Sequence, residues 1–226
     1  MKQKSLGKSV EGRSIEVLSF FDEPLCEKKL LLIGGVHGDE PEGTFLVSEF
    51  VKSGLWKKLE GQATLYVIPE LNPDGCLKQQ RMNANKVDLN RNMPTKDWDP
   101  VAHKERYNPG PKAGSEPETQ IIAKFIEEIK PHLIITCHSY DPMININGPC
   151  RKVAEHMQKF NNYEITPYIG YPTPGSMGTW AGQERNIPTI TLEIARDSQP
   201  KEIWETHSVA LIESLIYAAI HSNLDE

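Results

Sequence analysis

The chain of 226 residues is 38% hydrophobic and 25% charged, values that are ordinary for a globular protein in solution. This length fits one α/β domain, and we expect residues 1–226 to form a single domain with enough core to need no disulfides. The formal net charge of -6 gives no support to nucleic-acid binding, which usually comes with a basic surplus.

Neither the cysteines nor the N-terminal residues indicate export. The four cysteines show no C-x-x-C spacing; two disulfides are possible, but reduced thiols are the favoured interpretation. Residues 1–8 are positively charged, with no apolar run of signal-peptide length behind them. The apolar stretches are all too short to span a bilayer. We therefore expect a cytoplasmic protein that does not bind membranes, and the oligomeric state stays open.

The first third of the chain alternates strand and helix signals. Residues 14–20 alternate enough to predict an early strand, and residues 29–34 form the continuous apolar run of a strand buried on both faces. A helix is predicted to begin at Pro41, because apolar residues follow at helical spacing: Phe45, Leu46, Phe50, Val51 and Leu55. Residues 63–68 predict a second buried strand.

The middle of the chain, residues 72–114, is rich in Asn, Asp, Pro, Gly and Lys and shows little periodicity. A long irregular segment in a compact domain is usually functional or disordered. Polar motifs are densest here, which favours function.

The last half resumes the alternation. Ser115 and Glu118 match a capping box, which predicts a helix whose apolar face carries isoleucines and a phenylalanine. A third buried strand is predicted at residues 133–137. The remaining predicted elements are a helix, a strand and a long closing helix, at residues 151–160, 188–194 and 202–221.

Strands that alternate with helices predict an α/β fold with helices on both faces of the sheet. In such sheets, ligands bind beyond the C-terminal ends of the strands. A polar residue stands at or just past the end of four predicted strands: His37, Asn72, His138 and Glu193. The sequence therefore predicts that these side chains converge on one edge of the sheet.

His37 and Glu40 are spaced as a metal-binding pair. Imidazole nitrogens and carboxylate oxygens are good zinc ligands, and a catalytic zinc usually takes three protein ligands. Of the seven histidines, His138 is the one at the C-terminal end of a predicted strand, so it is the expected third ligand. The His-x-x-Glu pair alone is a weak signal that occurs often by chance. Its place among converging strand ends favours a metal site.

A zinc hydrolase also needs a carboxylate base to take a proton from water. Glu193 lies at the end of an otherwise buried predicted strand, where a carboxylate is costly without a partner. We predict that it is this base. The alternative is a glutamate on an edge strand that simply faces water.

Residues 81–92 supply groups that suit a peptide with a terminal carboxylate. Asn90 and Arg91 provide an amide donor and a planar guanidinium fork, and Arg81 could stabilise an oxyanion. Without their context, these arginines would be read as exposed loop residues.

Taken together, the motifs resemble the zinc carboxypeptidases of the carboxypeptidase A type. The matching segments run in the family's order and cover most of the chain: residues 7–13, 37–40, 72–75, 81, 88–91, 138 and 192–193. Three further segments resemble the bacterial murein tripeptide amidase branch: residues 83–92, 114–119 and 170–176.

This resemblance implies a three-layer α/β/α fold with a mixed, mostly parallel central sheet. It also implies cleavage of the γ-D-glutamyl–meso-diaminopimelate bond in small cytoplasmic murein peptides during peptidoglycan recycling. One Zn²⁺ ion per chain would be held by His37, Glu40 and His138. Because the chain is short for the broader family, we expect trimmed loops and an open cleft.

The resemblance also implies roles for the residues around the metal. Glu193 would be the base and then the proton donor, Arg81 would polarise the scissile carbonyl, and Asp88 would hydrogen-bond a ligating imidazole. The residues expected to bind substrate are Asn90, Arg91, Ser139 and Tyr171, with Tyr168 as the alternative tyrosine.

Two other functions are weighed against this one. A zinc N-acyl-amino-acid deacylase of the aspartoacylase and succinylglutamate desuccinylase type shares residues 35–41 and 88–91. Residues 72–75 and 174–176 favour the peptidase. A non-catalytic binding module is disfavoured, because every residue type that catalysis requires is present.

Overall fold

The structure is a computed structural model that describes residues 1–21 and 26–225. Its strands form one eight-stranded mixed sheet in the order β1-β2-β4-β3-β5-β8-β6-β7. The strands are β1 (Lys2–Lys8), β2 (Ser14–Phe20), β3 (Lys29–Ile33), β4 (Thr64–Ile68), β5 (Leu133–Tyr140), β6 (Met143–Asn147), β7 (Glu164–Thr166) and β8 (Thr189–Ala195).

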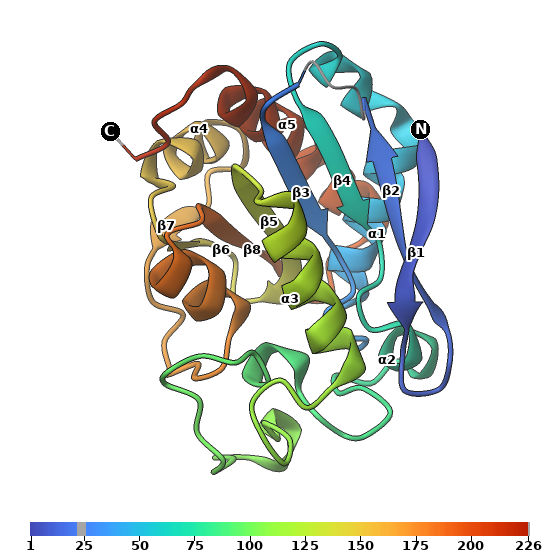
Figure 1. The fold of residues 1–226 in the computed structure, drawn as a ribbon. Helices are drawn as coiled ribbons and strands as arrows, with labels where there is room; N and C mark the ends of the chain where they lie inside the picture. Colours follow the sequence, from blue (N-terminus) through green and yellow to red (C-terminus); the bar gives the residue numbers. More distant parts are fainter. Residues whose placement is uncertain (22–25, 226) are drawn as a thin grey trace.

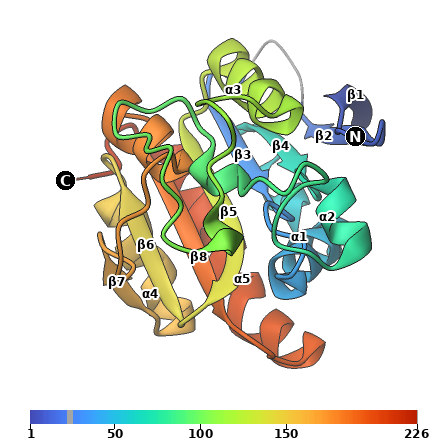
Figure 2. The ribbon, with the colours of Figure 1, turned by 90° about the horizontal axis from the view of Figure 1, so that it is seen from below.

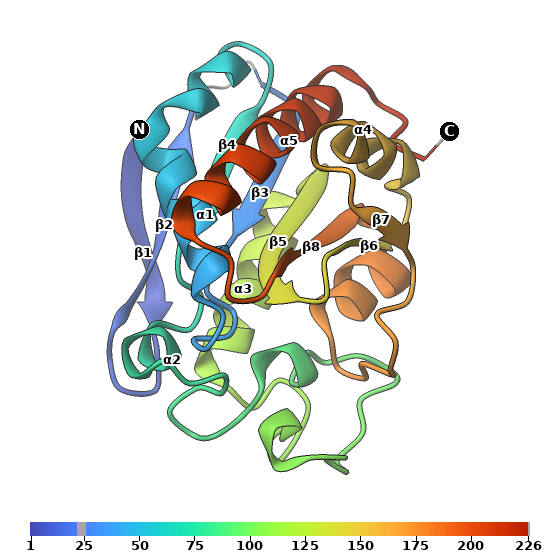
Figure 3. The ribbon, with the colours of Figure 1, turned by 180° about the vertical axis from the view of Figure 1, so that it is seen from behind.

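Helices cover both faces of this sheet (Figures 1 and 3). The α-helices are α1 (Pro41–Ser53), α2 (Pro73–Lys78), α3 (Pro117–Ile129), α4 (Arg151–Asn161) and α5 (Pro200–Ile220). Helices α1, α4 and α5 pack on one face, and α3 packs on the other together with a short π-helical segment, Gly178–Gln183. The expected three-layer α/β/α fold with a mixed sheet is confirmed.

The two cores follow from the alternation of side chains along buried strands. Leu30 and Leu32 of β3 join the core under α1, α4 and α5, whereas Leu31 and Ile33 join the core under α3. All four side chains are 0% exposed. A strand that is covered on both faces must be apolar at every position, which is why β3 is a continuous apolar run.

The centre of the sheet is parallel and sets the position of the site. Strands β4, β3, β5 and β8 are paired in parallel, so their C-terminal ends lie at the same edge. The irregular segment between α2 and α3 crosses this edge (Figures 1 and 2). The edge carries the polar residues that follow apolar strands in the sequence.

Two details differ from the expectations. The capping box is wrong: α3 has Glu116 at its N-cap with no side-chain cap, and the Glu118 carboxylate instead accepts hydrogen bonds from Val10 and Asn83. Pro117, at the first helical position, marks the start of the helix. Strand β5 extends to Tyr140, so His138 lies within the strand rather than after it.

Strands β1, β6 and β7 and helix α2 were not predicted. Strand β1 is mostly exposed and carries no apolar alternation. Strand β6 has only five residues and alternates isoleucine with asparagine, a pattern too short to read alone. The four cysteines are free thiols. Within the described residues, no helix is both long and apolar enough to cross a membrane.

Candidate active site

The loop after β3 is fixed by close packing against α2. A Cβ atom added to Gly38 would come within 2.0 Å of the carbonyl carbon of Gly75, so only glycine fits there. Asn72 ties the same loop to the end of β4, because its side chain donates to the Val36 carbonyl and accepts from the Gly75 N–H group. These contacts hold the backbone on which the first two predicted metal ligands stand.

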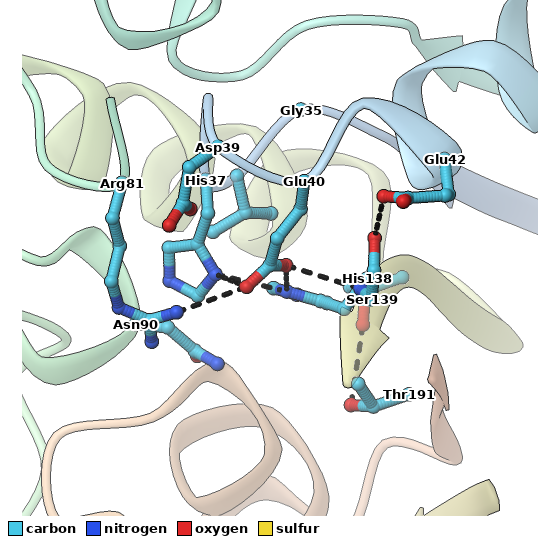
Figure 4. A network of polar contacts seen from close by, with 12 residues as sticks. Gly35, His37, Asp39, Glu40, Glu42, Arg81, Asn90, His138, Ser139 and Thr191 are labelled. Carbon is cyan, nitrogen blue, oxygen red and sulfur yellow. Dashed lines mark hydrogen bonds and ion pairs between the residues drawn. The ribbon is translucent and has the colours of Figure 1, made fainter. Parts of the chain in front are cut away.

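The three predicted metal ligands meet at one point. His37 Nδ1 lies 3.0 Å from Glu40 Oε1, and His138 Nδ1 lies 2.8 Å from Glu40 Oε2 and 3.1 Å from His37 Nδ1. Their ligand atoms all lie within 4.8 Å of one another. The residues are buried, and Figure 4 shows their side chains turned toward one another.

This donor set fits a zinc ion. Two imidazole nitrogens and one carboxylate oxygen make up a ligand set typical of catalytic zinc, with one coordination position left open. Two Nδ1 atoms facing each other at 3.1 Å cannot both hold a proton in that contact. A cation between the three groups would satisfy the lone pairs of all of them at once.

Asp88 and Arg81 flank this cluster. Asp88 Oδ1 lies 3.0 Å from His37 Nε2, an arrangement that orients the imidazole and leaves Nδ1 for the cluster. Burial alone would raise the pKa of Asp88, but Arg81 and His37 hold that pKa well below its usual range. Arg81 donates to Asp88 and to Glu40, both at 2.9 Å. Asp88 and Glu40 therefore remain ionised beside the histidines.

Glu193 faces the cluster from the neighbouring strand. Strand β8 lies between β5 and β6, and Glu193 pairs with His138. Since Glu193 is only 7% exposed, the alternative of a water-facing glutamate on an edge strand is wrong. Burial raises the pKa of Glu193 to about 7; His138 opposes this shift and Glu40 adds to it. A carboxylate with this pKa can accept and return a proton near neutral pH.

Aromatic and cationic side chains lie on one side of the histidine–glutamate cluster and Glu193. The guanidinium carbon of Arg91 lies 5.2 Å from the ring of Tyr107 and 5.9 Å from that of Tyr171. The two rings stack with their centroids 5.9 Å apart. Asn90 Oδ1 accepts from the Met177 N–H group at 2.8 Å, which orients its amide. Arg91 is thus held by two aromatic faces and by the hydrogen bond that it donates to the Asn90 carbonyl at 2.6 Å.

The predicted residues line two adjoining cavities. A cavity of about 200 Å³ is lined by the histidine–glutamate cluster together with Arg81, Asn90, Arg91, Ser139, Tyr171 and Glu193. A second cavity, of about 410 Å³, shares Asn90, Tyr171 and Glu193 with it and extends along the sheet to Thr191 and Asn145. We call them the catalytic pocket and the side cavity. Tyr171 lines both, whereas Tyr168 lines the side cavity.

Ser139 is held from behind by a residue that the sequence did not single out. Its hydroxyl donates to Glu42 Oε2 at 2.5 Å, and its N–H group donates to Glu40 Oε2 at 3.3 Å. Glu42, in the first turn of α1, also accepts from the N–H group of Asp197. Glu42 therefore joins α1 to the ends of β5 and β8, and substrate contact by Ser139 stays a prediction.

Five further residues of the catalytic pocket were missed: Arg106, Tyr107, Tyr140, Ile169 and Arg196. Tyr107 and Arg106 lie in a single 3₁₀ turn of the irregular segment, where no periodicity points to them. Arg196 directly follows β8 and lies three residues after Glu193. That position at a strand end is the one signal that could have identified it.

Comparison with known proteins agrees with this geometry. A family model described as zinc carboxypeptidase matches residues 1–152. Murein peptide amidase A of Escherichia coli strain K12 is 33% identical over 197 residues, which cover 80% of this chain and 78% of that protein. Murein peptide amidase A of Vibrio campbellii is 32% identical over 202 residues, with 84% and 78% covered.

Solved structures support the same relationship. The crystal structure of murein-tripeptide amidase from Escherichia coli O157 matches with a TM-score of 0.78 at 26% identity, covering 98% of this chain and 93% of that one. Carboxypeptidase A from Helicoverpa armigera matches in fold with a TM-score of 0.79 at 19% identity, covering 96% and 68%. The chain belongs to the zinc carboxypeptidase family and is a hydrolase of the metallocarboxypeptidase class.

Proposed function

We propose that this enzyme hydrolyses the γ-D-glutamyl–meso-diaminopimelate bond of small murein peptides. The observation that carries the proposal is the buried cluster of His37, Glu40 and His138 facing Glu193 inside one cavity. The likeness to murein peptide amidases, over most of the length of both chains, supports the choice of bond.

In this proposal, His37, Glu40 and His138 hold one zinc ion. Zinc in such a site supplies Lewis-acid chemistry, because it polarises the scissile carbonyl and makes water a better nucleophile at neutral pH. The open edge of the cluster faces the catalytic pocket, which is where the peptide must lie. Asp88 would keep the His37 ring in the orientation that binding requires.

Glu193 would move the protons of the reaction. It would accept one from the attacking water and then pass it to the departing amine of diaminopimelate. Its pKa of about 7 suits both steps, since the group is ionised often enough to act as base and basic enough to retain the proton. Arg81, held by Asp88 and Glu40, would donate to the oxyanion that forms on the scissile carbonyl.

The substrate would be held from the leaving-group side by Asn90 and Arg91. Their amide and guanidinium groups suit the α-carboxylate of diaminopimelate. Tyr171 lines both cavities and would cover this carboxylate. The side cavity, which Thr191 and Asn145 help to line, would accept the long polar side chain of diaminopimelate.

We place the enzyme in the cytoplasm, in peptidoglycan recycling. The four free thiols agree with a reducing compartment. The deacylase alternative is not favoured, because the relatives of this chain are murein peptide amidases and carboxypeptidases.

A panel of substrates tests the proposal. Purified zinc-loaded protein would be incubated with L-Ala-γ-D-Glu-meso-diaminopimelate, acetyl-aspartate and succinyl-glutamate, and products identified by mass spectrometry. We expect release of free diaminopimelate that stops when a chelator is added. Cleavage of the acylated amino acids with the murein peptide left intact would overturn the assignment of substrate.

A further inference from the structure

The catalytic pocket contains a second cationic side that the proposed mechanism does not use. Arg196 and Arg106 both line this pocket, together with the metal cluster. Arg196 stands directly after β8, and its charge is close enough to lower the pKa of Glu193. Neither arginine lines the side cavity, which is lined instead by Asn90, Tyr171 and Glu193. The two arginines therefore mark the side of the pocket away from the leaving group.

The guanidinium of Arg196 has no close acceptor among the described residues. Its contacts are the Ser139 carbonyl at 3.5 Å, Glu40 Oε1 at 3.6 Å and Asp39 Oδ2 at 3.9 Å. Charge-assisted hydrogen bonds to arginine normally measure about 2.7–2.9 Å. Arg81 in the same pocket makes two such bonds, at 2.9 Å. Arg81 thus uses its Nε and Nη1 groups within the protein and keeps only Nη2 for a ligand, whereas Arg196 makes no such close bond.

Asp39 lies between Arg106 and Arg196 and balances the positive charge of only one of them. Its Oδ2 atom lies 3.3 Å from Arg106 and 3.9 Å from Arg196. One carboxylate between two guanidinium groups leaves a surplus of one positive charge. Two other acids lie near Arg196: Glu40 belongs to the cluster that would bind the metal cation, and Glu193 faces that cluster. This side of the pocket therefore suits an anion.

The proposed substrate brings such an anion. In a γ-linked glutamyl residue, the α-carboxylate is free, and its carbon lies four bonds from the scissile carbonyl carbon, on the acyl side. An extended chain of four bonds spans about 5 Å, so the carboxylate stays within the same pocket as the reacting bond. An α-linked peptide has a carboxylate at this position only when its acyl residue is itself a glutamate.

We propose that Arg196, supported by Arg106 and Asp39, binds the free α-carboxylate of the γ-linked residue and so favours peptides whose acyl residue carries a carboxylate at this distance from the scissile bond. This inference rests on the proposed function, since it identifies how the same site recognises the acyl side of its substrate. This contact between Arg196 and the carboxylate takes no part in the chemical step, and it is equally strong in the ground state and in the transition state. Its loss should therefore raise KM and leave kcat nearly unchanged.

The test compares two peptides that differ in one group: L-Ala-γ-D-Glu-meso-diaminopimelate and its D-isoglutamine analogue, in which the α-carboxylate is an amide. We expect the unaltered enzyme to prefer the carboxylate by about 10-fold or more in kcat/KM, the size of one charge-assisted contact. Arg196→Gln should remove this preference through KM, and Arg196→Lys should keep part of it. The exposed pair of Arg151 and Glu155 supplies the control, Arg151→Gln.

A binding measurement separates recognition from catalysis. In a Glu193→Gln background, adding Arg196→Gln should weaken binding of the carboxylate peptide about 10-fold and leave binding of the amide peptide unchanged. Equal losses on both peptides, or no preference in the unaltered enzyme, would overturn the assignment of Arg196. If the unaltered enzyme released diaminopimelate from neither peptide, the proposed function would fall, and this inference with it.

Discussion

Glu193 illustrates how a single residue combines an unfavourable position with a proposed function. A carboxylate that is 7% exposed at the end of an apolar strand is costly, and its raised pKa is the measure of that cost. Interactions with His138, Arg81 and Arg196 lower the pKa again. The balance leaves a group whose two protonation states are both accessible near neutral pH, which is what a base that later donates its proton requires.

The first prediction concerns the identity of this base. Glu193→Gln keeps the shape of the side chain but cannot accept a proton, so we expect kcat to fall by about 10²–10⁴-fold. Zinc content, measured by mass spectrometry of the metal, should stay the same. Glu205→Gln, on the exposed face of α5, serves as the control. Turnover within a few-fold of the unaltered enzyme would exclude Glu193 as the base.

The second prediction concerns pH. Glu193 must be ionised to act as a base. We therefore expect kcat/KM to be at its maximum above the pKa of Glu193 and to fall tenfold for each pH unit below that pKa. Burial raises that pKa to about 7, and a bound cation moves the acidic limb to lower pH because it favours the ionised form. Arg196→Gln should move the limb upward, since a neighbouring positive charge is lost. If the acidic limb of the pH profile of kcat/KM moved to lower pH in Arg196→Gln, the account would be contradicted.

Helix α1 and strand β5 form the structural element that brings the ligands together. Glu40 is the N-cap of α1, and His138 lies on β5. Gly43 in the first turn of α1 lies against β5, where an added Cβ atom would be 2.3 Å from the Cys137 carbonyl oxygen. This close approach, together with the bond from Ser139 to Glu42, sets the spacing of the two ligands.

The third prediction tests this contact. Gly43→Ala forces α1 away from β5, so we expect the free energy of unfolding to fall by about 1–3 kcal/mol, as in other overpacked cores. Zinc affinity should fall as well, because the distance between Glu40 and His138 changes. Urea denaturation and zinc titration measure the two effects, with Lys52→Ala on the exposed side of α1 as control. Unchanged zinc affinity would show that α1 does not set the ligand spacing.

At the scale of the whole molecule, the parallel centre of the sheet explains what the sequence could reveal. The apolar runs of β3 and β5 stand out in the sequence, and His37, His138 and Glu193 lie near or beyond the C-terminal ends of β3, β5 and β8. The general rule for parallel sheets then brings these residues to one edge. The proposed zinc ligands and the proposed base were therefore within reach of sequence reasoning.

The rest of the pocket could not be predicted in this way. Tyr107 and Arg106 come from the irregular segment, whose path is set by hydrogen bonds such as those of the Asn92 side chain with Pro109, Lys112 and Ser115. No periodicity encodes such a path. Strand β6, which supplies Asn145 to the side cavity, is too short for its alternation to stand out.

The most direct test of the account is a zinc titration of metal-stripped protein, followed by release of diaminopimelate from L-Ala-γ-D-Glu-meso-diaminopimelate. We predict that activity is absent without metal, rises in proportion to bound zinc, and saturates at one zinc ion per chain. In His138→Ala, which lacks one of the three ligands, zinc should bind much more weakly. Full activity in metal-free protein, or unchanged zinc affinity without His138, would contradict the account.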